Sequence, residues 1–164
     1  MMSDKDTLIG NETTSCADEK KELFPWYKEG LRFSCTECGK CCTGTPGLIF
    51  VSEEEMQKMA EYLSLPLDLF KRKYTKKRDN RYLLVELKSK NFSCVFLENK
   101  KCSIYPVRPI QCQTFPWWKE NLKSKESWLD LATACEGIRE EAEVVPFTEI
   151  QRMLVKNGDQ ESQA

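Results

Sequence analysis

The chain has 164 residues, of which 40% are hydrophobic and 31% are charged, and its formal net charge is −1 at pH 7. This length suits one domain with loose ends, and the apolar content is typical of a globular rather than a disordered chain. The small net charge excludes a whole-molecule field that would steer the protein to nucleic acid or to an anionic membrane. No window approaches the roughly 20 consecutive apolar residues that span a bilayer, so no membrane partner is predicted.

The beginning of the chain and its cysteine content bear on compartment and chemistry. Residues 1–30 carry acids and amides where a secretory signal peptide needs a basic patch followed by an apolar run. We therefore expect a cytoplasmic protein, and disulfides are rare in the cytoplasm. The chain has nine cysteines and no histidine, which excludes mixed Cys/His zinc sites and Cys–His nucleophilic pairs. Any metal is held by sulfur, with carboxylate as an additional ligand type.

The sequence divides into a polar beginning, one domain and a short polar end. Residues 1–22, which include Cys16, are predicted to form a flexible N-terminal segment, and residues 159–164 a polar tail. The domain, residues 23–158, opens with a short apolar cluster that we expect to dock on it, formed by Leu23, Phe24, Trp26 and Tyr27.

Three segments carry helix signals. Ser52 and Glu55 form a capping box ahead of apolar residues at helical spacing, namely Met56, Met59, Ala60 and Leu63. The methionines are interpreted as core residues rather than ligands. Pro66 starts a second helix with Leu67, Phe70 and Tyr74 on one face. Residues 146–158 predict a third, with Thr148 as N-cap and Gly158 as its end.

Strand signals are short and lie around the cysteines. Residues 48–51, 82–88 and 93–97 are predicted strands, and the turn at 98–101 places Cys94 and Cys102 on either side of a hairpin. Three prolines limit residues 102–118 to a single helical turn. Residues 128–138, after a linker at 119–127, fit either helix or strand. We expect a strand, because Cys135-Glu136-Gly137 makes a plausible turn.

Residues 71–81, KRKYTKKRDNR, form a strongly basic run. We interpret it as the solvated face and end of the second helix, where the helix dipole favours cations. A phosphate or nucleic-acid contact is the less favoured alternative, because aromatic residues are sparsely interleaved with the charges.

The stretch FSCTECGKCCTG, residues 33–44, concentrates four cysteines among small and polar residues. Without apolar periodicity, these thiols are poorly suited to burial as structural cysteines. A disulfide framework needs an oxidising compartment. A redox-active CxxC motif at Cys35 and Cys38 is a stronger alternative to metal binding. Thioredoxin-like chemistry, however, has no use for the remaining thiols. Metal binding is the favoured interpretation, because thiolates select zinc, iron–sulfur clusters or Cu(I).

The spacing bears on the kind of centre. CxxCxxC, residues 35–41, matches the first part of a bacterial ferredoxin cluster run, but Cys42 follows at once where that run continues CxxxCP. Adjacent residues usually direct their side chains apart, so Cys41 and Cys42 fit two sites, or two metals of one cluster, more easily than one ion. With Cys16 set aside, eight cysteines make two sites of four, although a single binuclear site with spare thiols would also use them. The eight are Cys35, Cys38, Cys41, Cys42, Cys94, Cys102, Cys112 and Cys135.

The ordered motifs carry a resemblance to a known family. They are Phe33, Cys35, Cys38, Gly39, Cys41 and Cys42; Cys94, Phe96 and Leu97; Cys102, Ile104 and Tyr105; Arg108, Pro109 and Cys112; Phe115 and Pro116; and Cys135, Gly137 and Ile138. In this order they resemble the CxxCxxCC (YkgJ-type) cysteine-cluster family of zinc- or iron-chelating domains. The resemblance implies the same eight ligands. The chain has Gln113 after Cys112 where members of that family usually carry arginine.

The predicted fold class is α+β: a small single domain of short antiparallel strands and about three helices, organised around cysteine-ligated metal. The predicted function is binding of iron, as an iron–sulfur cluster, or of zinc, with iron slightly favoured by the CxxCxxC run. One alternative is a structural zinc module that binds a protein or nucleic-acid partner. The other is a cluster-dependent, protein-modifying enzyme, because some relatives are described as lysine N-methylases acting on flagellin. Against it, the chain has no glycine-rich methyl-donor loop. Arg108 and its aromatic neighbours (Tyr105, Phe115, Trp117 and Trp118) are interpreted as surroundings of the metal rather than catalytic groups.

Overall fold

The structure, a computed structural model, describes residues 24–44 and 47–163. The predicted N-terminal segment 1–22, with Cys16, and Leu23 lie outside the described residues. The α-helices are α1 (Glu53–Tyr62), α2 (Leu67–Tyr74), α3 (Ile110–Gln113), α4 (Lys119–Leu122), α5 (Lys125–Ala134) and α6 (Phe147–Gln163). The strands are β1 (Leu31–Arg32), β2 (Phe50–Val51), β3 (Thr75–Arg78), β4 (Arg81–Leu84), β5 (Glu86–Leu87), β6 (Ser93–Cys94), β7 (Leu97–Glu98), β8 (Lys101–Cys102) and β9 (Val144–Val145). Three short 3-10 turns are η1 (Lys40–Cys42), η2 (Lys88–Lys90) and η3 (Tyr105–Val107).

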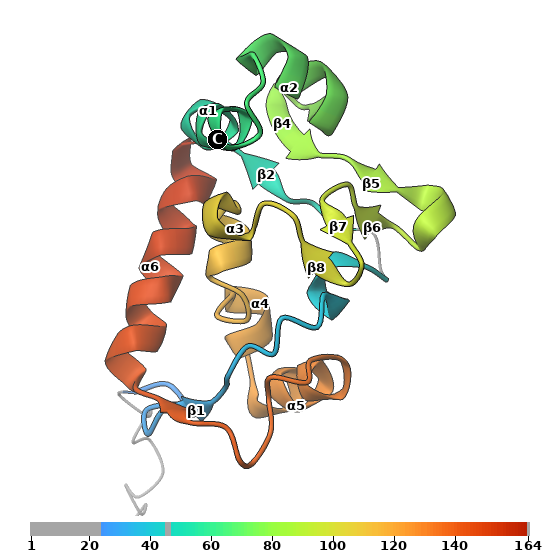
Figure 1. Cartoon of the computed structure of the whole chain (residues 1–164). Helices are drawn as coiled ribbons and strands as arrows, with labels where there is room; N and C mark the ends of the chain where they lie inside the picture. Colours follow the sequence, from blue (N-terminus) through green and yellow to red (C-terminus); the bar gives the residue numbers. More distant parts are fainter. Residues whose placement is uncertain (1–23, 45–46, 164) are drawn as a thin grey trace, which may run out of the picture.

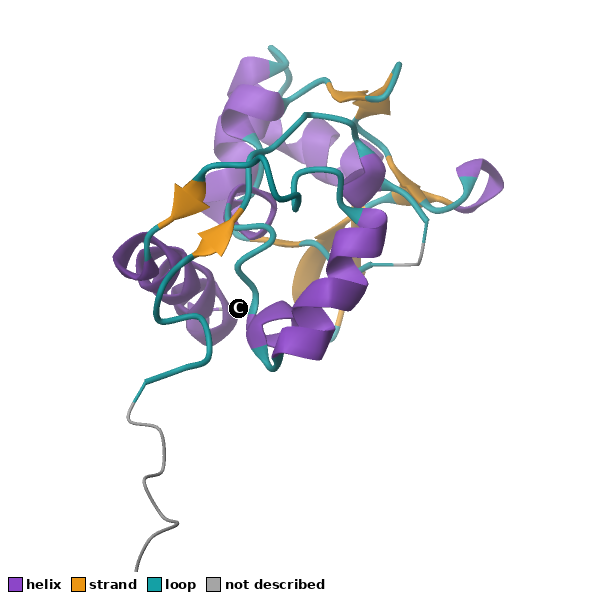
Figure 2. Ribbon diagram, turned by 90° about the horizontal axis from the view of Figure 1, so that it is seen from below, coloured by secondary structure: helices purple, strands orange, loops and turns teal. Residues whose placement is uncertain are grey.

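These elements confirm the α+β class. Every strand pair is antiparallel, and the strands form one three-stranded sheet in the order β2-β4-β3 and the pairs β1-β9, β5-β6 and β7-β8. Figure 2 shows these strands as short separate pieces joined by loops rather than as one continuous sheet. Of the described helices, α1, α5 and α6 have ten or more residues, and the others are one or two turns long.

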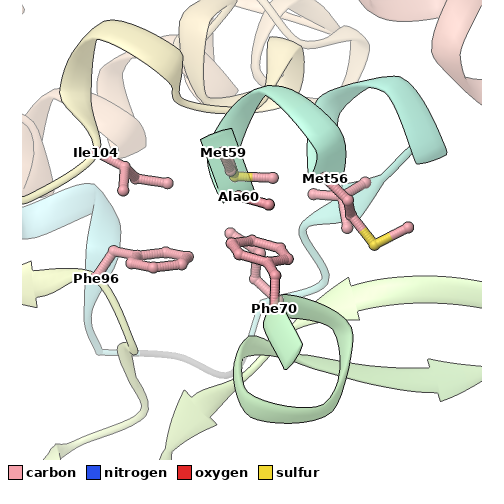
Figure 3. Close-up of a cluster of buried hydrophobic side chains, with 8 residues drawn as sticks. Met56, Met59, Ala60, Phe70, Phe96 and Ile104 are labelled. Carbon is pink, nitrogen blue, oxygen red and sulfur yellow. The ribbon is translucent and has the colours of Figure 1, made fainter. Parts of the chain in front are cut away.

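The first hydrophobic core, called core 1, lies between α1, α2 and the three-stranded sheet. Met56 and Met59 are fully buried there, as the helical spacing predicted. Figure 3 shows both methionines close to the ring of Phe70, which stacks on Phe96 with ring centroids 6.1 Å apart. Cys94 and Cys102 pack against the edge of this core. The predicted capping box at the start of α1 is present, with Ser52 and Glu55 as its partners.

The second hydrophobic core, called core 2, holds the aromatic residues of the other half. Trp117 stacks on Trp128 with ring centroids 5.4 Å apart, and both are buried. Tyr27 and Trp26 join this core, and Trp26 Nε1 donates to Leu122 O at 2.8 Å. The expected docking of the N-terminal aromatic cluster is therefore confirmed for these two residues, whereas Phe24 is exposed. In Figure 1, α6 runs along one side of the molecule from core 2 towards α1.

Two predicted assignments around α5 are wrong. Residues 125–134 form a helix rather than the expected strand, because the Ser124 side chain caps its start by accepting from Ser127 N at 3.2 Å. The helix turns Trp128 into core 2 and leaves Leu129 exposed, so its apolar periodicity is weak. Part of the predicted linker before it, Lys119–Leu122, forms α4.

Two further corrections concern strands and helix ends. Residues 71–74 of the basic run form the end of α2 as expected, but Thr75–Arg78 form the edge strand β3, paired with β4 from Thr75↔Leu84 to Arg78↔Arg81. The predicted strand 82–88 is interrupted after Leu84. Helix α6 begins at Phe147 and continues past Gly158, so Thr148 is not its N-cap and Gly158 is not its end.

No helix among the described residues is long and apolar enough to cross a membrane.

Candidate metal centre

The cysteine-rich loop begins beside the segment that follows α5. Ser34 N donates to Gly137 O at 2.9 Å, and a Cβ on Gly137 would lie 2.8 Å from Ser34 O. The absence of a side chain at Gly137 therefore lets the two backbones pair closely. Because Cys35 follows Ser34 and Cys135 precedes Gly137 by two residues, this contact brings the first and last of the eight cysteines into the same region.

The loop ends against the turn that precedes β6. Gly44 N donates to Asn91 O at 2.9 Å, and Thr43 Oγ1 donates to the same carbonyl at 3.0 Å. Thr43 Oγ1 also lies 3.1 Å from Ser93 Oγ. Thr43 follows Cys42, and Ser93 precedes Cys94, so these bonds hold the ends of the two cysteine segments together.

The middle of the loop packs on the β7–β8 hairpin. Gly39 has φ +72°, and a Cβ there would lie 2.5 Å from Lys100 O and 2.8 Å from Leu97 Cδ1. This contact places η1, which contains Cys41 and Cys42, beside the strand that ends at Cys102. In Figure 1 the loop (blue to cyan) climbs from β1 to just below β8. The predicted hairpin is confirmed, with Leu97 paired to Cys102, but the predicted strand 93–97 is divided, and Cys94 lies on β6 paired to Glu86.

Cys112 is positioned by the short helix α3. Ile110 N donates to the buried Glu55 carboxylate at 2.7 Å, which ties α3 to the start of α1. Gln111 Oε1 accepts from Phe50 N and Gln111 Nε2 donates to Leu48 O, both at 3.0 Å, so the same turn is fixed to β2. The one-turn helix α3 is thus fixed both to α1 and to β2, which border core 1.

Cys41 and Cys42 differ sharply in acidity, although they are adjacent. Their Sγ atoms lie 3.9 Å apart. The hydrogen bond from the Cys42 thiol, helped by the positive charge of Arg108, lowers the pKa of Cys41 to about 7. The same hydrogen bond raises the pKa of Cys42, as do burial and the nearby Cys41, Cys112 and Cys94. The pair therefore shares a single negative charge near neutral pH.

The other thiols of this half are held protonated mainly by burial. Burial raises the pKa of Cys94 to about 11, with a smaller contribution from Cys102. Burial also raises the pKa of Cys112, and the neighbouring Cys94, Cys41 and Cys102 raise it further. Each of these thiols thus has the others within electrostatic range. We call Cys41, Cys42, Cys94, Cys102 and Cys112 the five-cysteine group.

A second set lies towards α5. Burial raises the pKa of Cys135, and the neighbouring Cys38 and Cys41 add smaller contributions to that rise. Lys40 bridges to Glu136 at 2.7 Å between half-exposed side chains, which joins η1 to the residue after Cys135. Burial raises the pKa of Tyr105, and a hydrogen bond to Cys35 adds to that rise. We call Cys35, Cys38 and Cys135 the three-cysteine group.

Arg108 lies at the five-cysteine group, and of the aromatic residues expected around the metal Tyr105 contacts it directly. Its guanidinium sits 3.8 Å from the Tyr105 ring centroid, and its Nη1 donates to Tyr105 O at 2.8 Å. Its charge offsets part of the rise in the thiol pKa of Cys102 and Cys112. Trp117 belongs to core 2, and Trp118 contacts Phe115 edge to face and donates to the backbone of α3.

Gln113, the departure noted in the sequence, has a defined place in this structure. Its Nε2 donates to Arg108 O at 2.7 Å, and its Oε1 accepts from Lys156 Nζ at 2.9 Å. It therefore connects the segment bearing Arg108 to α6. The sequence did not indicate Glu136 or Lys40, and the one available signal was that Glu136 directly follows Cys135.

The eight cysteines within the described ranges are free thiols. In 24–44 and 47–163, no three Cys, Asp or Glu side chains have converged on the geometry of a single bound ion. The donor set nevertheless fits a soft metal, because it combines eight sulfurs with a local arginine and two glycines that allow close backbone packing. The cysteines are neighbours in two groups, and binding requires their sulfurs to draw together.

A small α+β domain that carries free thiols on five segments is of a kind suited to chelating a soft metal. Comparison with protein families bears this out: residues 34–136 match the family described as "CxxCxxCC: Putative zinc- or iron-chelating domain". The match covers more than half of the chain, and the chain belongs to this family.

A curated relative is "Uncharacterized protein MJ0661" of Methanocaldococcus jannaschii, which is 36% identical over 100 residues. The alignment covers 60% of this chain and 52% of the relative, so the chain spans about half the length of that protein. No solved structure matches the chain.

Proposed function

We propose that this protein binds metal through the thiolates of eight cysteines, as iron in an iron–sulfur cluster or as zinc. The ligands are Cys35, Cys38, Cys41, Cys42, Cys94, Cys102, Cys112 and Cys135. Support comes from the chelating family to which the chain belongs. The proposal rests on the course of the cysteine-rich loop. The loop is hydrogen-bonded to Gly137 at its start and to Asn91 at its end, so it runs from the three-cysteine group to the five-cysteine group.

The loop suggests how the ligands divide. Within the five-cysteine group, Cys42, Cys94, Cys102 and Cys112 would supply the four thiolates of one closed tetrahedral site. The three-cysteine group needs one more, and Cys41 has neighbours in both groups, including Cys135. We assign Cys41 to the second site, with Cys35, Cys38 and Cys135. Two centres of four thiolates also suit iron, because Cys₄ ligation serves both common cluster types.

Metal would then connect the two cores. Cys94 and Cys102 pack against core 1, whereas Cys135 ends the helix that places Trp128 in core 2. The loop between them carries the remaining ligands except Cys112. Because a structural metal contributes its binding energy to folding, the centres would stabilise the arrangement of the two cores. Arg108 would offset part of the roughly −2 charge of each four-thiolate zinc site.

Iron is favoured over zinc by the CxxCxxC run, and one experiment separates them. Anaerobically purified protein is analysed for iron, zinc and acid-labile sulfide, and its visible absorption is recorded. We expect iron with sulfide and a broad visible band. A colourless protein with about two zinc ions per chain, the capacity of eight thiolates at four each, would keep the ligand set and assign a structural role. Sub-stoichiometric metal that reconstitution does not raise would reject the proposal.

The division of ligands has its own test, in two double variants. Cys94→Ser/Cys102→Ser should lose the first centre and keep the second, and Cys35→Ser/Cys135→Ser should do the reverse. Each variant should therefore retain about half of the wild-type metal. Loss of all metal in both variants would indicate a single centre that needs all of the thiolates.

A further inference from the structure

The basic run, residues 71–81, is strongly positive in a chain that is otherwise acidic. Residues 71–81 contain seven of the 25 basic residues and one acid, Asp79, which gives this segment a charge of +6. Since the whole chain carries −1, the rest carries −7. The cations are Lys71, Arg72, Lys73, Lys76, Lys77, Arg78 and Arg81. They occupy the end of α2 and both strands of the β3–β4 hairpin, which we call the basic hairpin. In Figure 1, α2 and β4 lie at the end of the molecule away from α5.

Most of these cations have no carboxylate partner. Within the described part of the chain, only Lys71, with Glu53, and Arg78, with Asp79, form ion pairs. The Arg78–Asp79 pair is 3.5 Å long between exposed side chains, which gives it little strength. The positive charge of the basic hairpin is therefore largely uncompensated within the protein.

Aromatic rings hold several of the cations in place instead. Arg81 lies 3.4 Å from the Phe50 ring centroid, and Lys77 lies 5.6 Å from that of Tyr82. Lys73 lies 5.0 Å from the Tyr74 ring centroid. Such contacts orient a cation without neutralising it. The sparse aromatic residues in the run thus have a role that their spacing in the sequence did not reveal.

The strand geometry gives the charges a regular spacing. Lys76 and Arg78 share one face of β3, about 7 Å apart at two residues per pleat, and Lys77 lies on the other face. Asp79 and Asn80 close the hairpin with φ of +49° and +63°, the conformation of a tight two-residue turn. Lysines on an edge strand also discourage pairing with other chains. That role does not account for the exposed Arg72 and Lys73 on α2.

We propose that the basic hairpin binds the phosphate backbone of a nucleic acid. Largely uncompensated and mostly exposed cations on one hairpin and the adjoining helix end suit a polymer with one negative charge per nucleotide. An anionic membrane fits less well, because the turn at Arg78-Asp79-Asn80-Arg81 offers no apolar side chain to enter the lipid. This site is separate from the cysteines, and variants of the hairpin should leave the metal content unchanged.

The test is fluorescence anisotropy of the metal-loaded full chain with a labelled 16-nucleotide single-stranded RNA, over roughly 50–200 mM salt. Five phosphate contacts would give a slope of log K against log salt of about −3.5, at about 0.7 per contact on a single strand. Lys76→Ala/Lys77→Ala/Arg78→Ala should reduce the magnitude of that slope by about 2. The reversal to Glu at the same three positions should abolish binding at 50 mM salt.

The matched control places the same charge change elsewhere. Lys28, Lys123 and Lys125 are exposed and lie outside the basic hairpin, and Lys28→Glu/Lys123→Glu/Lys125→Glu should keep the slope near the wild-type value. Equal losses in the control and hairpin variants would overturn the proposal, because they would report net charge alone. So would no salt-dependent binding by the wild type, or binding restricted to phosphatidylserine vesicles. Unchanged circular dichroism and metal content in the variants would exclude misfolding as the cause.

Discussion

The Glu55 carboxylate holds the start of α3 against the start of α1. Its Oε1 accepts from Ile110 N at 2.7 Å, and its Oε2 accepts from Ser52 N at 2.8 Å. Glu55 is only 7% exposed, so neither backbone donor has water as an easy replacement. A helix-capping residue therefore also fixes the position of Cys112, two residues after Ile110. This link joins α1, the longer helix of core 1, to the proposed metal ligand Cys112.

Glu55→Gln should destabilise the protein by about 1–3 kcal/mol. The amide keeps one oxygen as acceptor, so one of the two buried N–H groups loses its partner. Urea unfolding of the metal-loaded protein measures the change. Glu54→Gln, in the same turn but exposed, is the control and should change stability by less than about 0.5 kcal/mol. Equal effects of the two substitutions would mean that the carboxylate bonds contribute nothing measurable.

Gly39→Ala should lower the metal content. The added Cβ meets Lys100 O at 2.5 Å, so the loop must move away from the β7–β8 hairpin and carry η1 with it. Gly44→Ala separates this contact from backbone strain, because Gly44 has φ +104° and no atom within 4 Å of the added Cβ. Metal analysis after reconstitution should show a larger loss for Gly39→Ala. Equal losses would assign the effect to positive φ alone.

In the metal-free protein, Cys41 should be alkylated well before Cys94 at pH 8. With its pKa lowered to about 7, Cys41 is mostly thiolate there, whereas Cys94, with its pKa raised to about 11, stays almost entirely protonated. Since the folded pKa of Cys41 lies below its ordinary value, its contribution to stability is complete above pH 9 and is lost as the pH falls through 7. Mass spectrometry of iodoacetamide-treated protein measures both rates against pH. A midpoint for Cys41 near 9 would contradict the hydrogen-bonded thiol pair.

Removing the metal should lower the melting temperature by at least about 6–12 °C. If the centres together contribute at least about 3 kcal/mol, a chain of this size should shift by roughly 2–4 °C per kcal/mol. Calorimetry before and after chelation measures the shift, and restoring the metal should reverse it. An unchanged melting temperature would show that the two cores do not depend on the metal for their arrangement.

Some of the fold was predictable because its signals are local. The capping box of Ser52 and Glu55 and the helical spacing of Met56 and Met59 predicted α1, and the structure confirms it. Helix α5 was missed because its apolar residues do not share one face, so the cap at Ser124 was the stronger signal. Strand β3 was missed because its charges were read as helical, although Asp79-Asn80 is a hairpin turn.

The eight thiols could be proposed as ligands from the sequence, but their arrangement could not be predicted from it. Cysteine chemistry and spacing indicated the eight thiols, and the family match supports metal binding by this domain. Their grouping depends on contacts between distant segments, such as Ser34 with Gly137 and Gly44 with Asn91. Those contacts are backbone hydrogen bonds, and residue types do not reveal which segments they join. The partner of Lys40 in its bridge to Glu136 likewise depends on how distant segments pack.

The most direct test of the central claim is the metal-to-protein ratio of single cysteine-to-serine variants. Each of the eight proposed ligands is replaced in turn, with Cys16→Ser as the control, and the purified proteins are analysed under anaerobic conditions. We predict loss of about half of the metal at each of the eight positions and none at Cys16. A variant such as Cys112→Ser or Cys135→Ser that keeps its full metal content would contradict binding by two centres of four thiolates.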